Sequence, residues 1–491
     1  MAFWAGNKNL APAELCEESE NNVNSLAHTR WTYDNDLFPI STRDLSGNKV
    51  LNASLSTNSL FTYDSQGRLS STRGMGDENQ SWGNIFYHYS VGGKINKVVR
   101  SGNFIKDRIS KNAQSLIDTY SYSATGQIGV LQKVNSTDGN EFADLTFAND
   151  EIGFRKFGVA PTLAVFQSEN SNRNIQDKSS STHFASSWKD QSEIPMQKYI
   201  WNGRGQLAGV FSASKQADSK EILANSLLNY RMNDESGGQI AEFDGVEFHQ
   251  LLNETASPKN NLSVNKLPRS VSVSQGITFE RDEIHFNIDI GPFATLRLIT
   301  RYPTLNAQNP ESLSSSSMQT RKELVIKDHV GSVSQIIDIT SHKVVERNAS
   351  EPFGLARGIP LLSNSNLDNY KSEGKRRDVS LYTNEQSNMR SNWEIKSYEI
   401  IGTSNENEAQ GMRGTSVFAK GKFSASTGLS NMGVRTLDPS RGVWMSPDIY
   451  VAQRLETVFQ SPAELNLFQY SKNNPIQFND ESGKIVPFAV W

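Results

Sequence analysis

The chain has 491 residues, of which 36% are hydrophobic and 21% charged, and its formal net charge is −4 at pH 7. This composition predicts a folded protein, and the near balance of 49 basic and 53 acidic side chains gives no basic surface for a nucleic acid or an anionic membrane. A single cysteine, Cys16, excludes an internal disulfide framework.

The N-terminal region carries no recognisable signal. It lacks a basic stretch followed by an apolar one, and no apolar run in the chain approaches the about 18 residues that a bilayer span requires. We therefore expect no signal peptide and no membrane span, which leaves the cytoplasm or secretion by a non-classical route. Residues 1–50 show no motif, and their structure stays uncertain at this level.

A short repeat organises the chain from about residue 61. An aromatic residue stands four positions before a glycine, which is followed by a long polar residue and then by Leu or Ile. The spacing between copies is irregular. The copies are Tyr63 to Leu69, Tyr89 to Ile95, Tyr122 to Ile128 and Trp201 to Leu207, and looser copies without the aromatic are Asn149 to Gly153 and Asn233 to Gly237.

Each copy predicts one β-hairpin. The alternating stretch before the turn, such as Phe61 and Tyr63 or residues 86–89, is typical of a strand whose aromatic side chains face one side. Asp, Asn or Ser beside a glycine favours a tight turn, and the following Leu or Ile returns to the buried face. One hairpin cannot bury its apolar face alone, so the hairpins are expected to join into a continuous sheet.

The segment YDSQGRLSSTRG at 63–74 resembles the consensus of the Rhs/YD-repeat family. The stretches 324–338, which contains Asp-His-x-Gly-Ser at 328–332, 350–357, 428–448 and 464–484 are similar to the core domain that ends Rhs chains. Within them, the segment Asp-Pro-Ser-Arg-Gly at 438–442 predicts a turn, and the aromatics that alternate with polar neighbours are expected in the core: Trp444, Phe468, Tyr470 and Phe478. The resemblance implies an all-β fold in which YD-repeat hairpins form a spiralling sheet, a hollow shell or part of one, closed by the Rhs core. It divides the chain into an N-terminal segment (1–50), a repeat shell (51–320), the core domain (321–484) and a short tail (485–491).

The resemblance also implies a candidate catalytic site. In the C subunits of toxin complexes, this core is an aspartyl self-protease that cuts the chain after a terminal Asp-Pro-x-Gly-Leu motif. Paired carboxylates can share one proton, so that one activates water while the other polarises the scissile carbonyl, and an arginine can hold the geometry. The matching residues are Arg435, Asp438 and Asp448, whereas the position after the arginine, an aspartate in that subgroup, is Thr436.

The expected cleavage segment departs from the family pattern. From Asp480 to Lys484, Glu481 replaces the usual proline and Lys484 the usual leucine, and only seven residues follow, too few for a toxin domain. Together with Thr436, these departures favour a structural shell protein whose core is a closing plug. The alternatives are an aspartyl self-protease that cleaves near its C-terminus and a teneurin-like recognition or adhesion module, which would need a signal or an anchor.

Cofactors and metals are not expected, because the seven histidines are dispersed and the nearest pair, His329 and His342, lies thirteen residues apart. His329 is interpreted as a hydrogen-bonded histidine of the shell rather than as a base. The repeats are fewer than a closed cocoon of this family usually contains. A complementary shell protein, like the B component of toxin complexes, or a toxin cargo is therefore the expected partner.

Overall fold

The fold is described from a computed structural model of the chain. It describes residues 29–45, 56–76, 81–108, 114–124, 129–138, 142–161, 196–215, 222–234, 238–244, 270–274, 277–280, 283–301, 319–340, 342–355, 408–410, 418–424, 427–448 and 466–484, with Ala53 and Arg357. The glycine of the third repeat copy (Gly126), the turn residues 235–237 and the tail 485–491 lie outside these ranges.

One long antiparallel sheet follows the chain, because each strand pairs with the next one in sequence from β1 to β21, and β22 is added parallel to β21. Its strands are β1 (Thr29–Tyr33), β2 (Pro39–Asp44), β3 (Ser59–Tyr63), β4 (Leu69–Gly74), β5 (Asn84–Tyr89), β6 (Ile95–Ser101), β7 (Ser115–Tyr122), β8 (Leu131–Thr137), β9 (Phe142–Asn149), β10 (Arg155–Val159) and β11 (Met196–Trp201). They continue as β12 (Leu207–Lys215), β13 (Ile222–Asn233), β14 (Gln239–Asp244), β15 (Ser270–Ser274), β16 (Ile277–Glu280), β17 (Glu283–Gly291), β18 (Ala294–Arg301), β19 (Gln319–Lys327), β20 (Val333–Asp338), β21 (Lys343–Arg347) and β22 (Glu408–Gln410).

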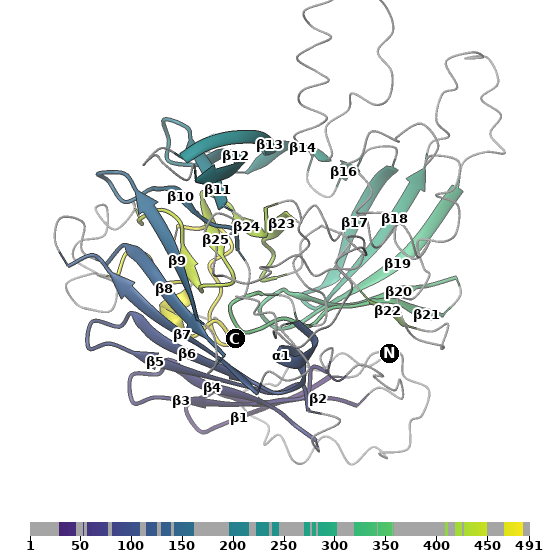
Figure 1. Cartoon of the computed structure of the whole chain (residues 1–491). Helices are drawn as coiled ribbons and strands as arrows, with labels where there is room; N and C mark the ends of the chain where they lie inside the picture. The colour runs from purple at the N-terminus through teal and green to yellow at the C-terminus, as the bar shows by residue number, and fades with distance from the viewer. Residues whose placement is uncertain are drawn as a thin grey trace, which may run out of the picture.

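The sheet curves around the C-terminal part of the chain, which lies on its inner face (Figure 1). There β23 (Lys422–Ser424), β24 (Leu429–Met432), β25 (Arg435–Asp438) and β26 (Val443–Trp444) form a second, four-stranded sheet. The all-β prediction is confirmed. Among the described residues the α-helix is α1 (Asn103–Arg108), whose 6 residues are far fewer than a bilayer-spanning helix needs.

The repeat turn has one geometry throughout. The Asp64 carboxylate Oδ1 accepts hydrogen bonds from the backbone N–H groups of Gln66 and Arg68, at 2.9 and 3.0 Å, and Gly67 takes the positive φ of +75° that favours glycine. The register shifts by one residue at Tyr63, as in a three-residue hairpin loop with a bulge. Two backbone bonds also close this turn, from the Asp64 N–H to the Arg68 carbonyl at 2.9 Å and from the Gly67 N–H to the Asp64 carbonyl at 3.0 Å. The same two backbone bonds close the turns Ser90–Lys94, Asp150–Phe154 and Asn202–Gln206. The predicted hairpins are confirmed there.

The repeat aromatic ties each hairpin to the one before it. The hydroxyl groups of Tyr63, Tyr89 and Tyr122 each donate, at 2.7 Å, to the carbonyl of the first residue of a strand in the preceding hairpin. Trp201 Nε1 likewise donates to the carbonyl of Arg155, the first residue of β10, at 2.8 Å. In the looser copy, the Asn149 amide donates to the Leu131 carbonyl at 3.1 Å. An asparagine therefore replaces the aromatic without loss of the tie between hairpins.

Three copies of the turn were not recognised in the sequence, and the last of them closes from Glu351 to Leu355 by the same two backbone bonds. From Asp34 to Phe38 the same bonds form, but Leu37 stands at the glycine position with φ +64°, so the motif is hidden within residues 1–50. The second copy runs from Asp328 to Ser332, where Asp328 Oδ1 accepts from the Val330 and Ser332 N–H groups at 3.0 and 2.7 Å. The Asp-His-x-Gly-Ser stretch is thus a repeat turn.

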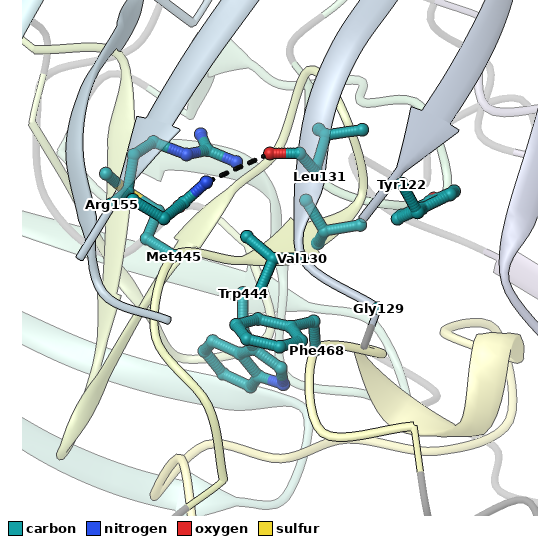
Figure 2. A pocket seen from close by; sticks show the side chains of 10 residues that line it. Tyr122, Gly129, Val130, Leu131, Arg155, Trp444, Met445 and Phe468 are labelled. Atoms are coloured by element: carbon teal, nitrogen blue, oxygen red, sulfur yellow. Dashed lines mark hydrogen bonds between the residues drawn. The ribbon is translucent and has the colours of Figure 1, made fainter. Parts of the chain in front are cut away.

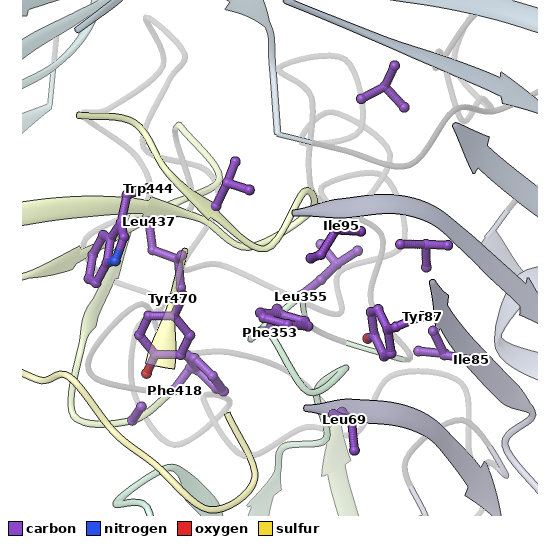
Figure 3. Packing of buried hydrophobic residues seen from close by; sticks show 14 of the residues in the cluster. Leu69, Ile85, Tyr87, Ile95, Phe353, Leu355, Phe418, Leu437, Trp444 and Tyr470 are labelled. Carbon is purple, nitrogen blue, oxygen red and sulfur yellow. The ribbon is translucent and has the colours of Figure 1, made fainter. Parts of the chain in front are cut away.

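A large hydrophobic cluster joins the inner face of the sheet to the C-terminal region (Figure 3). Leu69, Ile85 and Ile95 from the sheet belong to the same cluster as Trp444 and Tyr470 from the C-terminal region. Burial of the repeat Leu or Ile is confirmed by Leu69, Ile95 and Leu207, and the predicted core aromatics Trp444, Phe468 and Tyr470 are buried. Two expectations are wrong: Phe478 is half-buried, and Phe86 points away from the cluster with 39% exposure, because alternate residues of a strand face opposite sides.

Candidate functional site

Strand β25 presents the predicted residues on opposite faces. Its four residues are all buried, and alternation along a strand directs Arg435 to one side and Asp438 to the other. The turn that follows ends at Gly442, whose N–H donates to the Asp438 carbonyl at 2.9 Å, so the predicted Asp-Pro-Ser-Arg-Gly turn is confirmed. The structure therefore divides the predicted site between two environments.

On the first side, Arg435 binds two carboxylates. Its Nη2 lies 2.8 Å from Asp480 Oδ2 and 3.5 Å from Asp448 Oδ2, and its Nε donates to the Gly483 carbonyl at 2.6 Å. The guanidinium stacks on the Trp444 ring at 4.2 Å, which fixes its plane. Of the three candidate residues, Arg435 and Asp448 thus lie together, and the second carboxylate on this arginine is Asp480.

On the other side, Asp438 is held by cations. Its Oδ2 lies 2.6 Å from Arg155 Nη1, its Oδ1 accepts from the Ser440 hydroxyl at 2.6 Å, and Arg441 lies 4.0 Å away. Burial favours the neutral carboxyl, but the Arg441 and Arg155 charges and the Ser440 hydrogen bond outweigh it, so the pKa of Asp438 lies below its usual value. Asp438 is therefore an ionised partner of arginines and has no proton to share.

A second buried ion group lies beside the Asp438 group. Arg100 contacts Asp118 and, at 3.0 Å, Glu351, and its Nη2 donates to the Ser440 carbonyl at 3.4 Å. These side chains come from β6, β7 and the turn after β21, and all are less than a tenth exposed. The charges on this side of β25 are balanced within the protein interior, which is typical of a structural network.

The C-terminal segment, residues 466–484, is anchored to the repeat turns. The side-chain amides of Asn473 and Asn474 donate to the Gly93 and Gly67 carbonyls at 2.6 and 2.9 Å, and that of Asn479 donates to the Val330 carbonyl at 2.9 Å. His329 Nε2 hydrogen-bonds the Ile476 carbonyl, in agreement with the structural interpretation of this histidine. The segment therefore contacts turns from both ends of the long sheet.

Backbone strain marks the same segment. Ser471, Lys472 and Asn473 have φ values of +46°, +55° and +58°, and each left-handed residue of this kind costs about 1–2 kcal/mol. Both Ser471 and Asn473 are buried. The strain persists because the asparagine side chains are bound to the turns of the sheet.

The space around the site is small (Figure 2). A cavity of about 10 Å³, room for about one water molecule, lies between β7, β8, β10 and β26 and is lined by Tyr122, Leu131, Arg155, Trp444 and Phe468, among others. Pockets for small molecules usually measure about 300–1,000 Å³. Within the described ranges, no three side chains of His, Cys, Asp or Glu gather as metal ligands.

Sequence reasoning missed Asp480 as a partner of Arg435, and Arg155 and Arg441 as partners of Asp438. Asp480 belongs to the quoted cleavage segment, but its place beside Arg435 depends on a contact 45 residues away in the chain. Arg155 is 283 residues from Asp438, and no local pattern signals that pair. Arg441 was visible three residues after Asp438 in the same turn.

No family model matches the chain, and no curated protein matches it. Among solved structures, it is similar to a TcdB2-TccC3 assembly without its hypervariable C-terminal region, with 14% identity, a TM-score of 0.45, and coverage of 93% of this chain and 18% of that one. A Tc holotoxin pore of Photorhabdus luminescens gives 14% identity, a TM-score of 0.45, and coverage of 94% and 18%. The chain thus spans about a fifth of those chains, and a likeness of this size does not establish a shared function.

Proposed function

We propose that this chain is a shell segment of the Rhs/YD-repeat type, related to proteins that enclose a toxin, and that its C-terminal core is a closing plug. Residues 51–320 would form most of the wall and residues 321–484 the core. The observation that carries the proposal is the hydrophobic packing shared by the inner face of the sheet and the C-terminal region, in one large cluster and in a second that joins Tyr199 and Leu207 to Leu429 and Met445. A cargo or a complementary shell protein is the expected partner.

The chemistry of the interior supports a structural role. The buried carboxylates Asp118, Asp438 and Asp480 each contact an arginine, and the cavity beside Trp444 is too small for an ordinary substrate. Ion pairs that are satisfied within the protein fix the arrangement of the elements they join. A shell needs such fixed joints.

Enclosure can be tested with a protease-sensitive peptide fused after Trp491, digested in the folded protein and again after unfolding in urea. A shell should protect the peptide, so that cleavage in the folded protein is at least about tenfold slower than in the unfolded one. The same peptide fused before Met1, outside the core domain, provides the comparison for the rate of cleavage. Equal cleavage rates in the folded and unfolded protein would exclude enclosure of the C-terminal extension.

A second candidate function is self-cleavage after Lys484, with Arg435, Asp438 and Asp448 as the active residues. It is favoured by the contact of Arg435 with Asp448, Asp480 and the Gly483 carbonyl, one residue before the expected cut. Asp448 would take a proton from water as the hydroxyl adds to the Lys484 carbonyl carbon, and would return it to the leaving amide nitrogen. Asp438, held by Arg155, would position β25.

Self-cleavage predicts that the intact mass of the purified protein corresponds to residues 1–484, and that Asp448→Asn restores the mass of the full chain. Glu481→Gln is the matched control, because Glu481 lies in the same segment but forms a half-exposed ion pair with Lys420. The control should be cut like the wild type. A full-length mass for the wild-type protein would rule out this activity and leave the shell proposal untouched.

A further inference from the structure

Side chains of the first and last parts of the long sheet meet along a junction that we call the seam, between β1–β2 and β19–β21. Side chains join it: Asp44 at the end of β2 forms a 2.9 Å ion pair with Arg347 at the end of β21, and the Trp31 and His329 rings lie 4.1 Å apart. The ion pair is buried, because the Asp44 side chain is 7% exposed and the Arg347 side chain 3%.

The seam differs from the other junctions of the sheet. From β1 to β21, every strand pairs antiparallel with the next strand in the sequence. Across the seam, in contrast, no residue of β1 or β2 makes a β-sheet pairing with a residue of β19, β20 or β21 within the part of the chain that the structure describes. A ladder of backbone hydrogen bonds must break cooperatively, but a junction made of a few side chains can separate alone. Among the described strands, the seam is therefore a join held by side chains rather than by a backbone ladder.

The C-terminal segment (466–484) crosses this seam. On the side of the first strands, Asn474 donates to the Gly67 carbonyl in the β3–β4 turn at 2.9 Å. On the other side, Asn479 donates to the Val330 carbonyl in the β19–β20 turn at 2.9 Å, and His329 of that turn bonds the Ile476 carbonyl. Asn474 and Asn479, five positions apart in the chain, thus bind on opposite sides of the seam.

We propose that the C-terminal segment is a strap that holds the seam shut, and that the wall opens at the seam when the strap is released. This inference rests on the proposed shell function and adds the place of opening. The left-handed residues Ser471 to Asn473 direct Asn473 and Asn474 to the turns of the first hairpins, so their strain is held by the closed strap. Release of the strap would relieve that strain.

Hydrogen exchange of the full chain, followed by mass spectrometry, tests the strap with two variants on opposite sides of the seam. Asn474→Ala and Asn479→Ala should each speed the exchange of the slow amides in both 29–45 and 319–347 by about fivefold, the factor that corresponds to loss of the one hydrogen bond that each side chain makes to a turn of the wall. Exchange in 115–149 should stay at the wild-type rate. The two variants should give the same map although their side chains bind different turns.

Asn149→Ala is the matched control, because its amide makes one hydrogen bond to the Leu131 carbonyl inside a continuous part of the wall. It should speed exchange only around β7 to β9. A strap is excluded if Asn474→Ala affects only the first strands and Asn479→Ala only the last ones, or if both variants affect the whole chain evenly or not at all. The fused-peptide experiment tests enclosure separately, so either proposal can fail alone.

Discussion

Asp438→Asn is expected to lower the free energy of unfolding by about 3–5 kcal/mol, the usual cost of breaking a buried ion pair from one side. Asp438 is fully buried and lies 2.6 Å from Arg155, which is 2% exposed. The amide keeps the shape of the side chain but leaves the Arg155 and Arg441 charges uncompensated in the interior. Chemical denaturation of the variant and the wild type measures the loss.

Asp144→Asn provides the control for charge alone. Asp144 pairs with Lys133 at 2.7 Å on the same sheet, but both side chains are more than a third exposed, and exposed pairs contribute at most about 1 kcal/mol. A loss of the same size for both variants would contradict the claim that burial makes the Asp438 pair important.

The pH dependence of the difference gives an independent check. The folded-state pKa of Asp438 lies below the unfolded value of 3.8, so its contribution to stability is present above pH 3.8 and is lost as pH falls through the folded-state pKa. The asparagine variant has no such contribution to lose. The unfolding free energies of variant and wild type should therefore differ by a constant amount from pH 7 to pH 5 and should converge below pH 3.8.

The repeat hairpins could be predicted because their chemistry is local. An aromatic, a turn-forming Asp or Asn, and a glycine within five residues specify the strand end, the turn and the register together, and Tyr63 to Leu69 folds as this pattern indicates. The copy at Asp34 was missed because Leu37 occupies a conformation that the pattern reserves for glycine. Local rules therefore recover the wall wherever the residue types are typical.

The candidate site could be predicted only in part, because its contacts join distant segments. The family resemblance suggested Arg435 and Asp448 as partners, and the structure places them 3.5 Å apart. No local signal assigns Asp438 to Arg155 on β10, or Asp480 to Arg435. These ion pairs form only when the C-terminal region packs on the inner face of the sheet. The local sequence around either residue of a pair does not predict that packing.

Trp444→Ala is expected to cost about 3–5 kcal/mol of unfolding free energy, as for other large aromatic residues removed from a core. Trp444 is 1% exposed, packs edge-on against Tyr470 at a centroid distance of 5.3 Å, and supports the Arg435 guanidinium at 4.2 Å. Removal of the indole would leave a new cavity next to the existing one. It would also remove the ring on which the Arg435 guanidinium stacks. Both effects act where the C-terminal segment meets β25.

Trp444→Phe separates packing from hydrogen bonding. The indole Nε1 has no hydrogen-bond partner among the described residues, so its removal sacrifices no bond, and the smaller ring still contacts Tyr470 and Arg435. The phenylalanine variant should therefore lose clearly less stability than the alanine variant in the same denaturation experiment. Equal losses of stability in the two variants would mean that the indole N–H, rather than the ring, stabilises the contact between β26 and the C-terminal segment. A loss below about 1 kcal/mol for Trp444→Ala would mean that the C-terminal core does not depend on Trp444.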